Sequence, residues 1–172
     1  PAVLAETLRD FDNVKVVQAD VMEVDLHQLI QDEFSGLDVL VCANLPYYIT
    51  SPVIMKLLEE KLPVESLTVM VQKEAAVRIC AAPGTRACGA VSVAVQYYSQ
   101  PQILFDVPRD CFFPAPNVDS AVIRLNIRKE PPVKLETEEK QFFKLVKAAF
   151  GQRRKTVLNS LNTGLGKSKE EL

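Results

Sequence analysis

The sequence predicts an α/β fold in which helices cover both faces of a doubly wound sheet. Short apolar runs of the length of buried strands recur along residues 1–128, and segments with apolar residues at helical spacing lie between them. Because strands and helical segments alternate, we expect one sheet between helical layers. With 172 residues, of which 48% are hydrophobic, the chain can bury such a core.

The elements of the first half follow from apolar runs and from helix-start signals. Valines after the first helix predict a strand that ends at Asp20, and a second apolar run ends before Asn44. Pro52 follows two hydroxyl residues, which favours the start of a helix there. The strands expected in this half lie at 14–19, 37–43 and 67–71, and the helices at 2–9 and from 52 to about 62.

The second half continues the alternation and then becomes helical. Helices are expected at 73–80 and 89–98, and strands at 102–107 and 118–127. After two consecutive prolines, Pro131 and Pro132, the pattern is helical at 138–149 and again after residue 152. We therefore expect two parts, residues 1–128 and residues 129–172.

Charge also divides the chain into these two parts. Residues 1–128 contain 10 Lys and Arg against 16 Asp and Glu, whereas residues 129–172 contain 10 against 6. The basic second part is a candidate surface for phosphate groups. On charge alone, a solvated face of an amphipathic helix is an equally good interpretation.

Cysteine spacing and hydropathy exclude several classes of protein. The four cysteines, Cys42, Cys80, Cys88 and Cys111, have no metal-ligand spacing, and His27 is the single histidine, so no metal site is expected. The sequence contains neither a signal peptide nor an apolar run as long as a membrane span. We expect a cytoplasmic protein with reduced thiols and no membrane partner.

Residues 44–47 are the most distinctive segment of the chain. Asn44 follows a buried strand, and Pro46 and Tyr47 come next. At the carboxyl end of a strand, where α/β sheets bind ligands, this combination offers an amide oxygen, a stiff turn and an aromatic ring. These groups suit a planar base that carries an exocyclic amine. An ordinary turn is the alternative, because Asn, Pro and Tyr are common in loops.

A second distinctive segment comprises residues 112–120. Phe112 and Phe113 precede Pro114 and Pro116, and a strand-like run follows. Two prolines one residue apart hold a loop extended and fix the direction of the aromatic rings before them. The segment therefore suits a loop that presents an aromatic side chain.

Together these segments resemble the ribosomal RNA adenine dimethyltransferase family, in particular its small-subunit, KsgA-type group. Residues 44–52 are similar to motif IV of that family with its continuation, and residues 112–120 to its motif VIII. Further matching segments lie, in the same order, at 71–79, 96–98 and 150–156. The resemblance implies a Rossmann-like fold. It also implies an enzyme that uses S-adenosylmethionine to dimethylate N6 of two adjacent adenosines near the 3′ end of small-subunit (16S) rRNA during ribosome biogenesis.

The resemblance also implies roles for residues of the catalytic part. Asn44, with the carbonyls of Leu45 and Pro46, would accept the hydrogens of the target amine. Tyr47 and Phe112 would sandwich the flipped base, although either ring could instead belong to the core. Among the other aromatic residues, packing in the core is favoured for Phe113, Tyr97 and Tyr98.

The cofactor and the RNA would contact two further groups of residues. Asp20, with Val21 beside it, would accept a hydrogen bond from the adenine amine of S-adenosylmethionine, unless it only caps the next turn. Asn44 would also line the cofactor pocket. Residues of the basic segment after residue 151 would contact rRNA phosphates, unless they form a plain solvent-exposed surface. The residues proposed for RNA binding are Arg153, Arg154 and Lys155. His27 is expected to be a surface or capping residue.

The cofactor-binding glycine motif of the family is missing from this sequence. Residues 1–128 would then be a partial catalytic domain that lacks glycine-rich motif I, and residues 129–172 the start of the helical, rRNA-binding C-terminal domain. We expect an inactive, self-associating fragment of a longer, monomeric enzyme. Two alternatives stay open, namely a macrolide-resistance methyltransferase of the large-subunit rRNA and a non-catalytic ribosome-assembly or transcription factor. A nicotinamide-dependent oxidoreductase would need a glycine fingerprint that the sequence does not contain.

Overall fold

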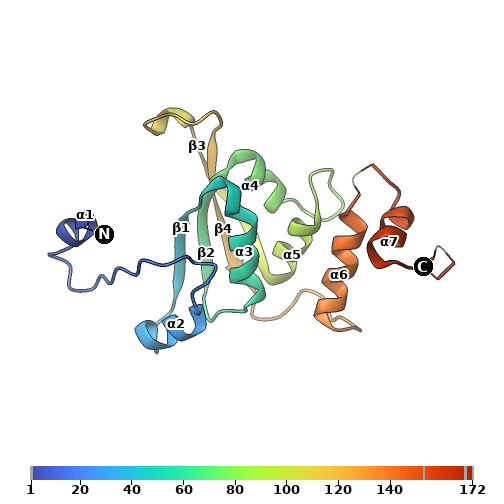
Figure 1. Cartoon of the computed structure of the whole chain (residues 1–172), viewed down its shortest axis with the longest axis horizontal. Coiled ribbons are helices and arrows are strands. Elements are labelled where there is room, and N and C mark those ends of the chain that lie inside the picture. The colour runs from blue at the N-terminus through green and yellow to red at the C-terminus, as the bar shows by residue number, and fades with distance from the viewer. Residues whose placement is uncertain (1, 153, 169, 172) are drawn as a thin grey trace.

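Four strands form one sheet in the part of the chain that the structure describes. The computed structural model describes residues 2–152, 154–168 and 170–171. The strands are β1 (Leu40–Asn44), β2 (Ser66–Gln72), β3 (Ser99–Val107) and β4 (Ser120–Ile127). Their order across the sheet is β1-β2-β4-β3. β1 and β2 are parallel, whereas β4 runs antiparallel to both of its neighbours, so β3 and β4 form an antiparallel pair (Figure 1).

Helices precede, separate and follow these strands. They are α1 (Ala2–Thr7), α2 (Leu26–Phe34), α3 (Thr50–Glu59), α4 (Lys73–Ile79), α5 (Ala90–Tyr98), α6 (Glu139–Phe150) and α7 (Val157–Leu165), with the 3-10 turns η1 (Tyr47–Ile49) and η2 (Arg109–Cys111). Local capping explains several boundaries. The carboxylate of Asp25 accepts from the backbone N–H of Gln28 at 3.0 Å and so begins α2. Gly166, with φ +67°, ends α7 in the left-handed conformation that glycine adopts without strain.

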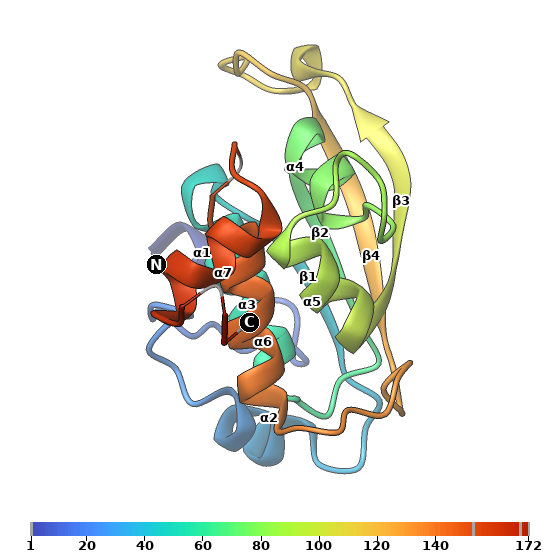
Figure 2. The ribbon, with the colours of Figure 1, turned by 90° about the vertical axis from the view of Figure 1, so that its right-hand side faces the viewer.

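The hydrophobic core lies on one face of the sheet. Leu67 pairs with Leu125, and Val69 pairs with Ile123, and all four side chains are fully buried. Alternate residues of a strand face the same side, so these side chains form a continuous apolar surface. Apolar residues of α3, α4 and α5 pack against that surface in the same cluster. Figure 2 shows α3 and α5 together on this side of the sheet.

The opposite face of the sheet is open among the described residues. Thr68, Met70 and Val122 are only half-buried there, and Arg124 is exposed. At the edge of the sheet, the Leu40 side chain is 64% exposed. The expected α/β class is therefore found, but the expectation that helices cover both faces is wrong for the part of the chain that the structure describes.

The predicted strand at 14–19 is also wrong. This segment has no regular secondary structure, and Val14, Val16 and Val17 are exposed. An extended segment becomes a strand only when its backbone groups pair with a neighbour. In Figure 1 the segment runs away from the sheet toward α1, and no described strand lies beside it. A run of valines such as that at 14–19 therefore forms a strand only where a neighbouring strand is present to pair with it.

The remaining predicted elements are confirmed, with shifted boundaries. The first helix ends earlier than expected, at Thr7, and the third strand begins earlier, at Ser99. The fourth strand begins at Ser120 rather than at residue 118. The helical pattern of the last part corresponds to α6 and α7. The division of the chain after residue 128 stays a prediction.

An aromatic cluster joins α6 to α5. Tyr97 packs edge-on against Tyr98 and Phe143, and the ring of Tyr98 stacks on Phe143 with their centroids 5.4 Å apart. Phe142 extends the cluster. Tyr97 is buried and Tyr98 half-buried, so the prediction that both pack in the interior is confirmed. α6 is therefore anchored on α5 by aromatic packing.

A carboxylate at the start of α6 strengthens this contact. Glu139 accepts from the Tyr98 hydroxyl at 2.5 Å and from Lys61 Nζ at 2.8 Å. Burial alone would raise the pKa of Glu139, but the hydrogen bonds from Lys61 and Tyr98 outweigh it and lower that pKa. Burial and the bond to Glu139 raise the pKa of Tyr98 far above its usual range. The network therefore favours ionised Glu139 and neutral Tyr98.

Candidate functional site

The turn after β1 is held by backbone and side-chain hydrogen bonds. Asn44 is the last residue of β1 and is exposed, whereas Leu45 is buried and donates its N–H to the carbonyl of Met70 at 3.3 Å. The carbonyl of Pro46 accepts from the Ile49 N–H and from the Thr50 hydroxyl, both at 3.2 Å. This turn therefore fixes Asn44 at the carboxyl end of a strand with its side chain accessible.

Tyr47 begins η1, and its hydroxyl forms a hydrogen bond with a residue of β4. Its oxygen lies 2.7 Å from Oγ of Ser120, the first residue of β4. The Tyr47 side chain is 37% exposed, so its ring is open to solvent on part of its surface. The contact joins the turn after β1 to the end of the loop that connects β3 and β4. Sequence analysis included Ser120 in the distinctive segment 112–120 but assigned it no role.

The loop between β3 and β4 lies at the same end of the sheet as this turn. β3 runs parallel to β1 and β2, so their carboxyl ends share one edge, and Figures 1 and 2 show the loop projecting beyond that edge. Asp119 fastens the base of the loop, because its carboxylate accepts from the Arg109 N–H and its carbonyl from the Lys73 N–H, both at 3.0 Å. The loop is therefore tied down at its base while its tip projects.

The two phenylalanines of this loop differ in environment. Phe112 is half-buried and extended, with φ −117° and ψ 148°. Phe113 is fully exposed, so the prediction that it packs in the core is wrong. A loop that projects from the sheet has no core within reach of a second ring. The aromatic pairs found among the described residues do not include Tyr47 with Phe112, so the sandwich of these two rings stays a prediction.

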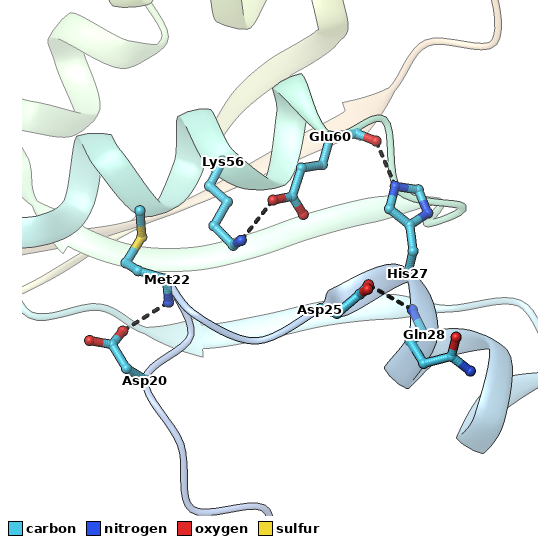
Figure 3. A network of polar contacts seen from close by, with 7 residues as sticks. All are labelled: Asp20, Met22, Asp25, His27, Gln28, Lys56 and Glu60. Carbon is cyan, nitrogen blue, oxygen red and sulfur yellow. Dashed lines mark hydrogen bonds and ion pairs between the residues drawn. The ribbon is translucent and has the colours of Figure 1, made fainter.

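Asp20 lies in an irregular turn rather than at the end of a strand. Its Oδ1 accepts from the Met22 N–H at 2.8 Å, and Figure 3 shows the carboxylate turned toward its own backbone. Its carbonyl accepts from the N–H groups of Glu23 and Val24. Val21 is half-buried and packs against the main core. The capping role considered for Asp20 is therefore present, and the cofactor role stays a prediction.

Figure 3 also places the single histidine. His27 Nε2 lies 2.8 Å from the carbonyl of Glu60, the C-cap residue of α3, and Lys56 pairs with the carboxylate of Glu60 at 2.7 Å. His27 therefore ties α2 to the end of α3, as expected for a capping residue. Among the described residues, no group of three His, Cys, Asp or Glu side chains could hold a metal ion.

Basic residues gather around α6 and the connection that follows it. Arg154 and Lys155 are exposed, whereas Arg153 lies outside the described residues. A groove of about 790 Å³ beside α6 and α7 is lined in part by Lys140, Lys144 and Lys147. The carboxyl end of α6 and the loop between β3 and β4 both point upward in Figures 1 and 2, although Figure 1 shows α6 at the right and the loop at the upper left. Sequence analysis noted the charge of this part but did not identify these three lysines.

The cysteines of the molecule fall into two environments. Cys42, two residues before Asn44, and Cys111, the neighbour of Phe112, are exposed. Cys80 is partly buried, and burial raises the pKa of its thiol to about 11. The two exposed thiols therefore lie on the two segments that form the candidate site. In the described part of the chain, no helix is both long enough and apolar enough to cross a membrane.

Two solved structures share this arrangement of strands and helices. A dimethyladenosine transferase from Plasmodium falciparum superposes with a TM-score of 0.72 and 25% identity, covering 93% of this chain and 55% of that one. The 23S rRNA methyltransferase ErmE superposes with a TM-score of 0.67 and 24% identity, covering 94% of this chain and 62% of that one, which supports the fold alone. The protein therefore has the Rossmann-like methyltransferase fold.

Sequence comparison then identifies the family. Residues 2–172 match the family described as ribosomal RNA adenine dimethylase. A relative from Alkaliphilus metalliredigens, named ribosomal RNA small subunit methyltransferase A, is 54% identical over 170 residues, which are 99% of this chain and 59% of that protein. A relative of the same name from Clostridioides difficile is 52% identical over 164 residues, 95% of this chain and 56% of that protein. The chain belongs to the ribosomal RNA adenine dimethylase family and spans less than three fifths of the length of these relatives.

Proposed function

We propose that the chain is part of an enzyme that dimethylates N6 of two adjacent adenosines in small-subunit rRNA during ribosome biogenesis, with S-adenosylmethionine as methyl donor. The observation that carries the proposal is the turn of residues 44–47, which holds Asn44 accessible at the carboxyl end of β1. It occurs in a chain that is 54% identical over nearly its whole length to a protein named ribosomal RNA small subunit methyltransferase A. The enzyme would act in the cytoplasm, where ribosomes assemble.

The proposed chemistry depends on how the target amine is held. The lone pair of an adenine amine is delocalised into the ring, which makes the nitrogen a poor nucleophile. Asn44 Oδ1 and the carbonyl of Leu45 would accept the two amine hydrogens and draw them out of the ring plane, because the carbonyl of Pro46 already accepts from the Ile49 N–H and the Thr50 hydroxyl. The freed lone pair would then form the N–C bond, and the amine would lose one proton to water. When bound, S-adenosylmethionine supplies the methyl group from a sulfonium, and the remainder of the cofactor leaves as a neutral thioether. Because this leaving group needs little acid or base catalysis, the positioning of the amine accounts for most of the rate enhancement.

Stacking would hold the flipped base in reach of Asn44. Tyr47 has a ring that is partly open to solvent, and Phe112 lies on the loop beyond the same edge of the sheet. Each stacking face contributes about 1–3 kcal/mol by alanine substitution, and any base can use it. Since the base must leave its stack in the RNA, two such faces would offset the cost of flipping.

Asp20 and Val21 are the described residues that suit the cofactor. Asp20 is exposed, and one of its carboxylate oxygens caps the turn to Met22. Its second oxygen has no hydrogen-bond partner in the described part of the chain, so it could accept from an adenine amine. Val21 beside it offers an apolar contact for the ring. The acceptor oxygen of Asp20 and the apolar side chain of Val21 together suit an adenine-containing cofactor.

RNA phosphates would contact the basic second part of the chain. Arg154 and Lys155 are exposed, and Arg153 precedes them in sequence. Lys140, Lys144 and Lys147 add three cations along one side of α6. Together with the exposed Arg154 and Lys155, they form a surface suited to a polyanion. Figure 1 shows α6 and α7 at the right of the molecule and the loop between β3 and β4 at the upper left.

The two alternatives are less well supported. A likeness to ErmE at 24% identity concerns the fold, whereas relatives at 52% and 54% identity are named for the small subunit. This difference favours small-subunit rRNA over large-subunit rRNA as substrate. A non-catalytic assembly factor would not need the amide, proline and ring of residues 44–47, which are all present.

The test is methyl transfer by a full-length form, in which the chain is extended to the whole length of its relatives. We expect tritium from labelled S-adenosylmethionine to enter small subunits that lack the modification, and digestion to yield dimethyladenosine. Tyr47→Ala and Phe112→Ala should each slow a single turnover about 10-fold or more, as expected for losing one stacking face. Phe34→Ala, which changes an exposed ring of α2, is the control. Label that enters large subunits instead supports the macrolide-resistance alternative, and binding without label supports the assembly factor.

A further inference from the structure

The hydroxyl of Ser120 and that of Tyr47 form a contact between two segments far apart in sequence. Their oxygens lie 2.7 Å apart, a normal distance for a hydrogen bond between hydroxyls, and either group can donate. Tyr47 belongs to the turn that would hold the target amine, and Ser120 ends the loop that carries Phe112. The contact therefore joins the two segments on which the proposed base sandwich depends.

Ser120 is the fixed member of the pair. Its side chain is fully buried, and its backbone lies between Gln72 of β2 and Val107 of β3. The preceding residue, Asp119, is itself fastened to Lys73 and Arg109. A hydroxyl on a central strand with pairing on both sides has little freedom to move. The Ser120 oxygen is thus a rigid anchor.

Tyr47 is the member that needs an anchor. Its ring is partly exposed, and it begins a 3-10 turn of only three residues. A ring held only at Cβ can turn about χ1 and χ2, and a bond at the far end of the ring, on the phenol oxygen, removes most of that freedom. A stacking surface fixed before the ligand arrives costs less entropy on binding than a mobile one.

We propose that Ser120 is a positioning residue, whose hydroxyl holds the Tyr47 ring in the orientation that stacks on the target adenine. This inference rests on the proposed function and assigns the role to a residue that touches neither base nor cofactor. The hydroxyl of Tyr47 serves as the attachment point, and its ring serves as the stacking face. The pairing also accounts for a tyrosine rather than a phenylalanine at position 47.

A purely structural role for Ser120 makes a different prediction. A buried hydroxyl needs a partner, so Ser120→Ala could lower stability without affecting turnover. Ser99 provides the matched control. It is also fully buried, lies on β3 at the other end of the β3–β4 pair, and bonds the carbonyl of Val95 at 2.8 Å. Ser99→Ala removes a comparable buried bond far from Tyr47.

Turnover is measured in the full-length form under single-turnover conditions, with cofactor and small subunits saturating. We expect Ser120→Ala and Tyr47→Phe each to slow methyl transfer about 5- to 10-fold, the scale of one net hydrogen bond between neutral groups. The double variant should be no slower than either single variant, because both remove the same bond. Ser120→Thr should retain most of the rate, and Ser99→Ala all of it.

The position of the ring is measured separately, in the 172-residue chain labelled with 3-fluorotyrosine. The chain has four tyrosines, and Tyr47→Phe identifies the fluorine resonance of Tyr47. We expect Ser120→Ala to shift and narrow that resonance, and Ser99→Ala to leave it in place. An unchanged resonance or an unchanged rate in Ser120→Ala overturns the positioning role, as do additive losses in the double variant. A wild-type protein that binds small subunits without transferring label overturns the proposed function instead.

Discussion

Asn44 illustrates how the position of one side chain determines its possible chemistry. The amide is exposed, but the residues around it are fixed, since Leu45 is buried and bonded to Met70 and the Pro46 carbonyl binds the next turn. An accessible amide on a rigid backbone is preorganised, whereas the same amide in a mobile loop would pay an entropy cost on binding. The sequence predicted this residue because its neighbours form a recognisable motif. It could not predict Ser120, whose role depends on a contact with a residue 73 positions away.

Replacing Asn44 by alanine should slow methyl transfer at least about 100-fold in the full-length form. One preorganised polar group that acts on the reacting atoms is worth about that factor. Affinity for small subunits should change little, because the contact concerns a single base. A single-turnover assay with labelled cofactor measures the first quantity and filter binding the second. Asn13→Ala, at an exposed asparagine outside the turn, is the control, and a near-normal rate for Asn44→Ala would remove Asn44 from the mechanism.

At the scale of elements, sequence patterns predicted strands and helices well where partners are present. β2 and β4 are apolar at every second residue because one face meets the helices, and this pattern is visible in the sequence. The segment at 14–19 has the same composition but no neighbouring strand among the described residues, so its valines remain exposed. Phe113 was assigned to the core because it is aromatic, although its loop projects from the sheet. Pairing and loop direction are tertiary properties that local composition does not contain.

The contact of α6 with Tyr98 and Lys61 through Glu139 should be pH-dependent. The pKa of Glu139 is lowered in the folded protein, so its contribution to stability is present above the unfolded pKa of about 4.3 and is lost as the pH falls through the folded value. Glu139→Gln should therefore lower the melting temperature at pH 7 by more than it does at pH 4. Calorimetry across that range measures the difference. An equal effect at both pH values would contradict this assignment, and Glu136→Gln in the preceding loop is the control.

The contact between α6 and α7 depends on the absence of a side chain at Gly164. A Cβ at this position would lie 2.7 Å from the Cβ of Ala148 and 2.9 Å from its Cα, closer than atoms can approach. Gly164→Ala should therefore push the helices apart and cost about 1–3 kcal/mol, as overpacking does. Chemical denaturation measures the loss. Gly89→Ala is the matched control, because a Cβ there would meet nothing within 4 Å, and equal stability of the two variants would refute the close approach.

At the scale of the whole molecule, the sheet is covered on one face and open on the other among the residues that the structure describes. β1 lies at the edge of the sheet and pairs with β2 alone among the described strands, and Leu40 on it is largely exposed. Phe105 on β3, at the opposite edge, is also exposed. Open edges and apolar surface favour association with further strands. This arrangement concerns the 172-residue chain by itself.

We expect the 172-residue chain to self-associate and to bind S-adenosylmethionine at least about 100-fold more weakly than the full-length form, a loss of about 2.7 kcal/mol. The sequence contains no Gly-x-Gly-x-x-Gly segment, so Asp20, Val21 and Asn44 would hold the cofactor with few contacts. Sedimentation velocity measures the first property and titration calorimetry the second. A monodisperse monomer that binds as tightly as the full-length form would contradict both expectations. Leu40→Lys should reduce the association, whereas Leu145→Lys, at an exposed leucine of α6, should not.

The two exposed thiols give the protein a built-in pair of reporter positions. Cys42 lies on the strand that ends in Asn44, and Cys111 lies beside Phe112 on the projecting loop, whereas the thiol of Cys80 stays protonated and unreactive at neutral pH. After Cys88→Ser, a maleimide spin label should therefore attach to these two positions and not to the core. The separation of the labels, read by pulsed electron spectroscopy, would then record whether the loop closes toward β1 when an adenine-containing RNA is added. Because both labelled residues are native cysteines, no cysteine has to be introduced at either segment of the site for this measurement.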